Sequence, residues 1–161
     1  MDAIDLHVHS TFSDGTLTPS ELVSRAKQFH LAAMALTDHD TIEGIPEAVQ
    51  AAKEQNLELV PGVELSTFWD EKEIHIVGLF IDYTDKTFQK ELESLRDVRR
   101  NRNITMCEKF TQLGIPIDYS DMEKEYADAV ITRAHFAEGE ACRKRYDLRP
   151  DHYFQGRYRR R

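Results

Sequence analysis

The stretch Ile4–Asp14, with the sequence IDLHVHSTFSD, decides how the rest of the chain is interpreted. Its first half is a short apolar run of the kind that forms a β-strand, and it carries His7 and His9 two residues apart. Side chains at positions i and i+2 leave a strand on the same face. The two imidazoles are therefore predicted to converge on one point just beyond the strand.

A carboxylate follows the two histidines within a few residues. Asp14 lies in a Ser/Asp/Gly turn that can fold its side chain back toward the same point. Two neutral imidazoles and carboxylate oxygens form a donor set that suits Zn, Mn or Fe. In the alternative interpretation, one histidine packs within the strand and the other faces solvent, so the metal hypothesis depends on the residues downstream.

Composition limits the class of protein. The chain has 161 residues, of which 40% are hydrophobic, enough for the core of one domain. It has no apolar run of about 18 residues and its acidic start is unlike a signal peptide, so we expect a cytoplasmic protein without a membrane segment. Cys107 and Cys142 match neither a zinc motif nor a disulfide framework. The net charge of −8 argues against broad nucleic-acid binding, although bound divalent ions would still allow an anionic substrate.

Helical and strand patterns alternate after the first strand. A capping box at Thr18–Glu21 marks one helix start, and continuous apolar runs mark strands that are buried on both faces. This alternation implies right-handed crossovers and a parallel sheet with its chemistry at the carboxyl ends of the strands, as in barrels. The pattern predicts helices at about 19–29 and 46–55 and strands at 31–37, 57–64 and 73–81.

Metal-ligand residue types recur at the ends of these elements. His39 follows the second strand, Glu64 lies just past the apolar core of the third, and His75 lies near the start of the fourth. Because a parallel sheet brings strand ends together, one metal cluster explains these positions better than unrelated core histidines do. One ion needs only three or four protein ligands, so the set implies at least two ions with Glu64 as the natural bridge. The predicted ligands are His7, His9, Asp14, His39, Glu64, His75 and His135.

A long amphipathic helix is predicted from Thr87 to Leu113. Arg99 and Arg102 fall in a gap of its apolar stripe. This pattern indicates either a solvent break between two packed halves or a guanidinium pair turned toward a bound anion. Further helix starts are predicted at Ser120 and Thr132.

The segment 138–161 has a different composition. Seven arginines occur between Arg143 and Arg161, interleaved with aromatic residues and without helical or strand periodicity. The pattern is typical of disorder, and alternatively of contact with single-stranded nucleic acid through phosphates and base stacking.

As a set, these motifs resemble the PHP (polymerase and histidinol phosphatase) domain family, in its TrpH-like phosphoesterase branch. The resemblance implies an α/β fold, an incomplete PHP-type distorted (β/α)₇ barrel with a helical insertion, and up to three divalent ions (Mn, Zn or Fe). The matching motifs are His7-Val8-His9-Ser10, Asp14-Gly15, Leu36–Asp40, Pro61–Glu64, His75 and Ile131–Phe136. The implied division is an N-terminal part of the barrel over 1–83, the insertion over 84–130, a return to the barrel over 131–137 and the tail over 138–161.

The resemblance also implies an activity and a distribution of ligands. Relatives of this branch hydrolyse phosphate esters of nucleotides, including 3′,5′-bisphosphates, and some trim RNA 5′ ends, so the implied substrate is a phosphorylated nucleotide or a short RNA. A hydroxide that bridges two ions would attack phosphorus. The implied first ion is held by His7, His9 and Glu64, the second by Glu64, His75 and His135, and the third by Asp14 with His39.

Other residues receive supporting roles. Arg99, Arg102 and Arg133 are candidates to bind the substrate phosphate. Asp38 is expected either to orient a ligand imidazole or to stabilise its turn.

The chain departs from the family pattern near its end. Relatives supply a late Asp-x-His pair, whereas Asp151-His152 has another spacing and no such pair follows His135. We therefore expect a truncated or frame-shifted member whose sheet has open edges. Three functions remain in view: a metal-dependent phosphoesterase, a catalytically silent metal-binding fragment of one, and an accessory domain that contacts nucleic acid.

Overall fold

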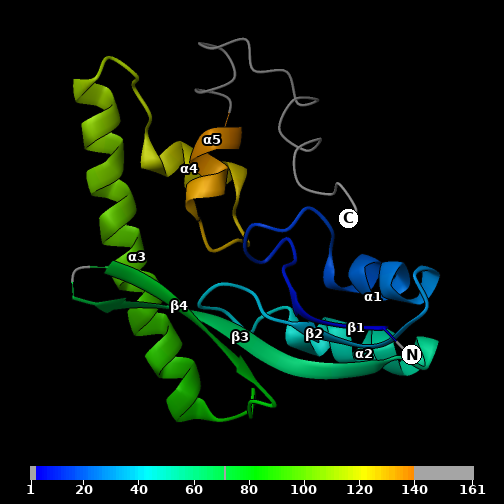
Figure 1. Ribbon diagram of the computed structural model, residues 1–161. Helices are drawn as coiled ribbons and strands as arrows, with labels where there is room; N and C mark the ends of the chain where they lie inside the picture. The colour runs from blue at the N-terminus through cyan, green and yellow to red at the C-terminus, as the bar shows by residue number, and fades with distance from the viewer. Residues whose placement is uncertain (1–2, 71, 140–161) are drawn as a thin grey trace.

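The computed structural model describes residues 3–70 and 72–139. It contains a β-sheet with two helices between its strands, followed by a helical part (Figure 1). The elements are β1 (Ala3–Val8), α1 (Pro19–Gln28), β2 (Leu31–Leu36), α2 (Ile45–Gln55), β3 (Glu58–Trp69), β4 (Lys72–Leu79), α3 (Lys86–Gln112), α4 (Tyr119–Glu125) and α5 (Arg133–Glu138). Most of the arginine-rich tail, together with Cys142 and Asp151-His152, lies outside the described residues. Within the described ranges, no helix combines the length and the apolar character that a membrane span requires.

The sheet has the strand order β1-β2-β3-β4, and its first three strands are parallel as predicted. The expectation of a parallel sheet is wrong for β4, which pairs antiparallel with β3 from Gly62–Leu79 to Trp69–Lys72. Only residues 70 and 71 separate these two strands. A parallel connection needs a crossover of a dozen or more residues, so the chain can only form a hairpin here.

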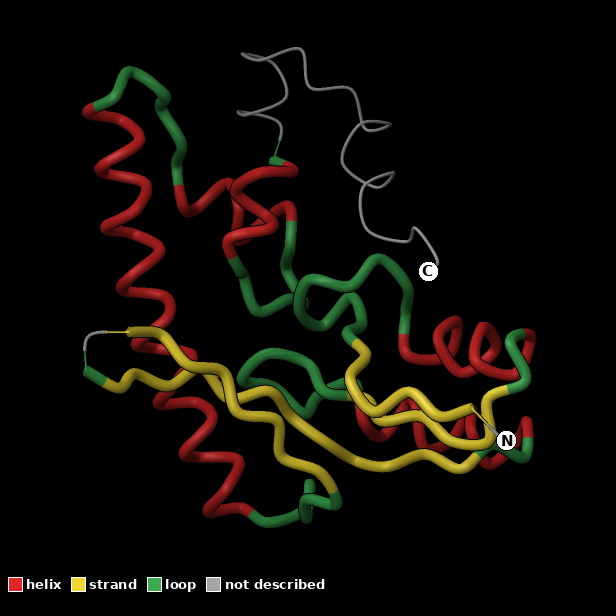
Figure 2. The backbone as a smooth tube through the Cα atoms, in the orientation of Figure 1, coloured by secondary structure: helices red, strands yellow, loops and turns green. Residues whose placement is uncertain are grey.

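Strand β3 is longer than the apolar pattern predicted. Its first residues pair with β2 as far as Pro61, and its remainder pairs with β4, so the strand passes from one partner to the other (Figure 2). Glu64 therefore lies in the middle of β3. On one side it pairs with β4, and on the other side it pairs with the loop that follows β2.

The described chain has two apolar cores. The first joins the sheet to α1, α2 and the beginning of α3, which contributes the buried Leu92 and the partly buried Phe88 and Leu95. The second joins the later part of α3 to α4 and α5 around Cys107 and Phe136. Between Leu92 and Cys107, helix α3 buries two polar residues, Arg99 and Asn103. The two packed halves predicted from the gap in the stripe are therefore present, but Arg99 is not at a solvent break because it is only 6% exposed.

The helix starts follow local capping chemistry. Thr18 and Thr132 each form a capping box, which confirms the starts of α1 and α5. Helix α4 begins two residues earlier than predicted, because the Asp118 side chain accepts the Ser120 N–H and is the N-cap in place of Ser120.

Candidate metal centre

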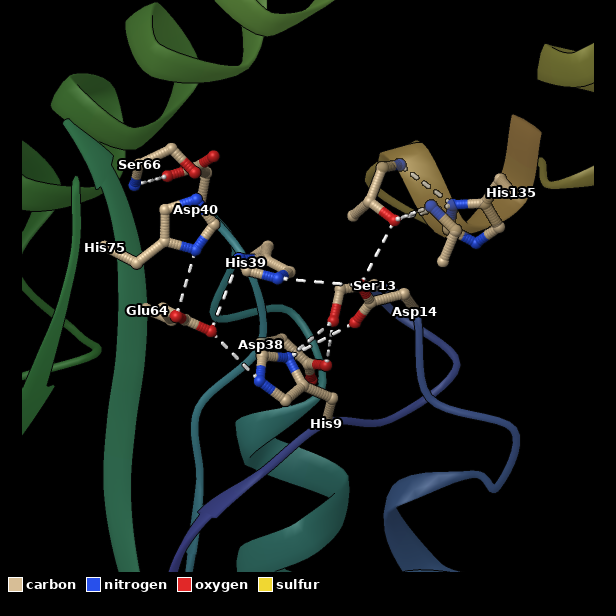
Figure 3. Close-up of polar contacts among 12 residues, drawn as sticks. His9, Ser13, Asp14, Asp38, His39, Asp40, Glu64, Ser66, His75 and His135 are labelled. Atoms are coloured by element: carbon tan, nitrogen blue, oxygen red, sulfur yellow. Dashed lines mark hydrogen bonds and ion pairs between the residues drawn. The ribbon is translucent and has the colours of Figure 1, made fainter. Parts of the chain in front are cut away.

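Four imidazoles surround the carboxylate of Glu64, whose side chain is 8% exposed, and Figure 3 shows three of them, those of His9, His39 and His75. Its Oε2 lies 3.0 Å from Nε2 of His7 and 3.0 Å from Nε2 of His9. Its Oε1 lies 3.0 Å from Nδ1 of His75. His39 approaches Oε2 through Nδ1 at 3.5 Å. The predicted convergence of His7 and His9 on one point is therefore present.

Backbone pairing places these side chains. The Thr37 N–H donates to the Val8 carbonyl at 2.8 Å, which holds the ends of β1 and β2 together. The loop after β2 then continues along β3, because Glu64 N–H donates to the Asp38 carbonyl at 3.1 Å and Asp40 N–H donates to the Glu64 carbonyl at 3.0 Å. His39 lies between those two bonds, directly beside Glu64.

The hairpin brings in the remaining imidazole. His75 is opposite Ser66 in the antiparallel register, and Glu64 is two residues from Ser66 on the same face of β3. The diagonal neighbour in such a pair is within reach of a long side chain. Because β4 is antiparallel, its early residues lie near the carboxyl ends of the parallel strands β1 and β2.

A tight turn returns Asp14 to the cluster. A Cβ on Gly15 would lie 2.0 Å from the His9 carbonyl oxygen, so only glycine fits this approach. The Gly15 N–H donates to the Ser10 carbonyl at 2.9 Å and closes the turn. The Asp14 carboxylate then lies 3.5 Å from Nδ1 of His9 and 3.5 Å from Nε2 of His39.

Asp38 stabilises the same turn. It accepts the Ser10 N–H at 2.7 Å, the Ser10 hydroxyl at 2.6 Å and the Ser13 hydroxyl at 2.6 Å. Burial raises the pKa of its carboxyl, and the three hydrogen bonds oppose that rise. Of the two predicted roles, these contacts support the structural one. The connection to a ligand imidazole runs through Ser13, whose Oγ lies 3.3 Å from Nδ1 of His9.

The hydrogen bonds favour a cation between the rings and Glu64. Because the Ser13 hydroxyl donates to Asp38, it accepts from His9, and Nδ1 of His9 carries the proton. Nε2 of His9 then faces Glu64 Oε2 at 3.0 Å, a contact that is favourable when a positive charge lies between the two atoms. A bound metal ion would supply such a charge.

His39 gives the same indication. Burial lowers its pKa to about 4, so the ring is neutral at neutral pH and one nitrogen has a free lone pair. Its Nδ1 is buried and has no hydrogen-bond partner among the described residues. Neutral imidazoles with carboxylates are the donors that borderline divalent ions prefer, so the residues present fit such an ion.

Three overlapping ligand sets emerge, and in each set the ligand atoms lie within 4.8 Å of one another. They are His7, His9 and Glu64; His39, Glu64 and His75; and His9, Asp14 and His39. The first set agrees with the one implied by the family resemblance. The second contains His39 in place of the expected His135, and the third adds His9 to the expected Asp14 and His39.

His135 lies outside these sets and is not brought to Glu64 and His75 (Figure 3). Its Nδ1 accepts the Thr132 N–H at 2.8 Å as part of the α5 capping box, and its ring packs 4.3 Å from that of Tyr126. Burial lowers the pKa of His135 as well. The Thr132 hydroxyl donates to Asp14 at 3.1 Å, so the start of α5 meets the centre at Asp14. A ligand role for His135 stays a prediction.

Arg99 connects helix α3 to the loop that carries His39. Its Nε and Nη2 donate to Oδ2 of the buried Asp40 at 2.9 and 2.6 Å, and Nη2 also donates to the Ser66 hydroxyl. Asp40 has a left-handed φ of 51° and also accepts the Ser66 N–H at 2.8 Å. Sequence reasoning used Asp40 only as part of a motif and missed this ion pair, because its partner lies 59 residues away.

Glu73 is a further residue that sequence reasoning missed. It lies 3.3 Å from Nε2 of His75 and 3.2 Å from Nη1 of Arg102, and it forms an ion pair with Arg133. The signal was available, because Glu73 and His75 are two residues apart on one strand, the same spacing as His7 and His9.

Comparison with known proteins identifies the family. The model of the PHP domain matches residues 5–149. The chain belongs to the PHP domain family. A 5′-3′ exoribonuclease of Haemophilus influenzae is 49% identical to this PHP chain over 133 residues, which are 83% of the chain and 48% of the relative. A 3′,5′-nucleoside bisphosphate phosphatase of Chromobacterium violaceum is 40% identical over 139 residues, 85% of the chain and 48% of the relative.

The fold agrees with this membership. A solved protein of Bifidobacterium adolescentis, named as a metal-dependent phosphoesterase, superposes with a TM-score of 0.78 at 30% identity, covering 89% of this PHP chain and 50% of the other. The incomplete barrel expected from the sequence is confirmed as a mixed α/β half-barrel. This PHP chain spans about half the length of the curated relatives that it matches.

Proposed function

We propose that this chain is a metal-dependent phosphoesterase acting on phosphate esters of nucleotides, with 3′,5′-bisphosphates, AMP-like esters or RNA 5′ ends as substrates. One observation carries the proposal: four imidazoles, from His7, His9, His39 and His75, surround the single carboxylate of Glu64. Relatives named as a 5′-3′ exoribonuclease and a nucleoside bisphosphate phosphatase support the substrate class.

The proposed cofactor is a set of up to three divalent ions, Mn, Zn or Fe, held by the three ligand sets. When bound, such ions polarise a phosphoryl oxygen and activate the attacking water. Glu64 contributes to two of the sets through its two oxygens, and His135 remains a candidate further ligand. Asp38 keeps the turn before Asp14 in place through its bonds to Ser10 and Ser13.

Arg99, Arg102 and Arg133 are proposed to bind the phosphate, and their contacts favour Arg102 and Arg133 over Arg99. The side chain of Arg133 is 63% exposed and that of Arg102 is 24% exposed. Both pair with Glu73, which in turn contacts His75. Arg99 is already paired with Asp40, which supports a role in holding the His39 loop. A cytoplasmic location belongs to the same proposal, and the buried free thiol of Cys107 is consistent with it.

The test is phosphate release with ions counted in parallel. Purified full chain, loaded with manganese, is incubated with a nucleoside 3′,5′-bisphosphate, and bound metal is measured after dialysis. We expect metal-dependent release that His9→Ala reduces by at least about a hundredfold, since this residue belongs to two ligand sets. His30→Asn is the matched control, because His30 is exposed, lies outside the sets and has a φ of 56° that asparagine tolerates.

A second candidate follows from the half-length match to the relatives: a metal-binding fragment without activity. It predicts bound ions without phosphate release from folded protein. Folded protein that neither retains ions nor releases phosphate would contradict both proposals.

A further inference from the structure

Three guanidinium groups are concentrated near His75. Those of Arg99, Arg102 and Arg133 share two carboxylates, Asp40 and Glu73, whereas the Glu64 carboxylate pairs with imidazoles. Burial lowers the pKa of Arg102, and the positive charges of Arg99 and Arg133 lower it further. The three cations are therefore close enough to repel one another.

Glu73 is the anion at the centre of this group. Arg102 and Arg133 both pair with its carboxylate, and the side chain is 13% exposed. The carboxylate is thus shared between two guanidiniums.

This arrangement differs from an ordinary surface ion pair on the same helix. Arg100 pairs with Glu123 at 2.8 Å, one cation with one anion, with side chains that are 50% and 40% exposed. In contrast, Glu73 has two cationic partners and its oxygens are largely shielded from water. Two guanidiniums that converge on one shielded anion are the usual recognition geometry for a phosphate, which carries more charge and more acceptor oxygens than a carboxylate does.

The position of the pair is adjacent to the metal centre. His75 contacts Glu73 through Nε2 and Glu64 through Nδ1, so a single imidazole separates the guanidinium pair from the ligand sets. A cavity of about 260 Å³ between the β3–β4 hairpin and α3 is lined in part by Glu73, Arg102 and Phe68. This space gives the Glu73 side chain room to change its conformation.

We propose that Glu73 is an internal competitor for an anion site formed by Arg102 and Arg133, and that the phosphate of the substrate displaces its carboxylate. The identification of the anion as substrate rests on the proposed function. A phosphate dianion matches the two guanidinium charges, whereas the carboxylate leaves one of them uncompensated. Glu73 then keeps the site closed to weakly charged anions and makes the free protein bind phosphate less tightly than its arginines would allow.

The test is calorimetric titration of inorganic phosphate into the full chain, with and without manganese. If Glu73 occupies the site for about nine-tenths of the time, Glu73→Gln tightens phosphate binding about tenfold, because the competing conformation is removed. Adding Arg102→Gln or Arg133→Gln to that variant abolishes the gain. Glu123→Gln is the matched control, since it removes a carboxylate from an arginine on α3 away from the site and leaves phosphate affinity unchanged.

Equal or weaker phosphate binding by Glu73→Gln overturns the proposal, and so does a gain that survives loss of both arginines. Glu73→Ala gives the same sign without an amide in the network, so a folding defect in one variant, detected by circular dichroism, leaves the other to decide. The readout is binding alone. Tenfold tighter binding in a protein that hydrolyses no ester would refute the phosphoesterase and keep the anion site.

Discussion

The sheet part of the chain and its helical part contribute different chemistry to one place. Every member of the three ligand sets comes from the sheet strands or the loops that follow them, whereas α3 and α5 contribute the guanidiniums of Arg99, Arg102 and Arg133. Strand ends and loops tied by backbone bonds hold short side chains in register. Helices bring long cationic side chains from further away. The candidate metal ligands and the proposed phosphate-binding groups are therefore placed by separate parts of the fold.

The two parts meet through polar contacts. Arg99 pairs with the buried Asp40 at 2.6 Å, and Thr132 donates to Asp14 at 3.1 Å. Each apolar core lies on its own side of these contacts. Substitutions at the junction therefore test whether the helical part supports the metal centre or only lies beside it.

The largest effect is expected from Arg99→Met. The substitution leaves the fully buried carboxylate of Asp40 without a cation, which costs about 3–5 kcal/mol of the free energy of unfolding. Urea denaturation measures the loss. The double variant Arg99→Met with Asp40→Asn removes both charges and should recover a large part of it, since asparagine tolerates the φ of 51°. A loss below about 1 kcal/mol in the single variant would show that the junction contributes little.

A smaller effect is expected from removing the cap of α5. Thr132→Ala and Thr18→Ala each delete a capping box and should each cost about 1 kcal/mol of stability. Only Thr132 also donates to Asp14, so only Thr132→Ala should weaken binding of manganese, by about tenfold, in a metal titration. Equal metal affinities in the two variants would mean that the helical part does not act on Asp14.

The smallest effect is a pH dependence of stability in the metal-free protein. Burial lowers the pKa of His39 to about 4 and also lowers that of His135, so the unfolded chain binds more protons than the folded one below the ordinary histidine pKa near 6.5. Stability is fully present above that value and falls as the pH drops toward 4. Between pH 8 and pH 6, His39 should account for about 1 kcal/mol or less.

Thermal melts across this range with His39→Gln and His135→Gln divide the effect between the two parts of the fold. Each substitution should flatten the pH dependence by its own share. A stability that is constant from pH 8 to pH 5 would contradict neutral buried imidazoles in both parts.

Much of the fold was predictable from local patterns. The capping boxes at Thr18 and Thr132, the buried run before Asp38 and the long helix that became α3 each depend on neighbouring residues, so the sequence expresses them directly. The antiparallel β4 was missed because the inference of parallel strands was extended past the point where helices connect them. The link between β3 and β4, from Trp69 to Lys72, is too short for the crossover that a parallel strand requires.

The candidate site was predictable to a similar depth. The i, i+2 spacing and the positions at strand ends identified six residues that the structure brings together, because residue type and strand register determine which side chains share a face. His135 could not be placed in this way. The same ring can serve as a ligand or as part of a helix cap, and its distance from Glu64 and His75 depends on how α5 packs against the sheet.

The sequence by itself determined the residue types, the elements that carry them and the membership in the PHP family, since these follow from local periodicity and motif spacing. Only the tertiary structure decided which charges are paired. The ion-pair partners of Arg99, Arg102 and Glu73 lie between 29 and 60 residues away in the chain, apart from the neighbouring His75. Ion pairs are formed by proximity in space after packing, and no local pattern encodes that distance.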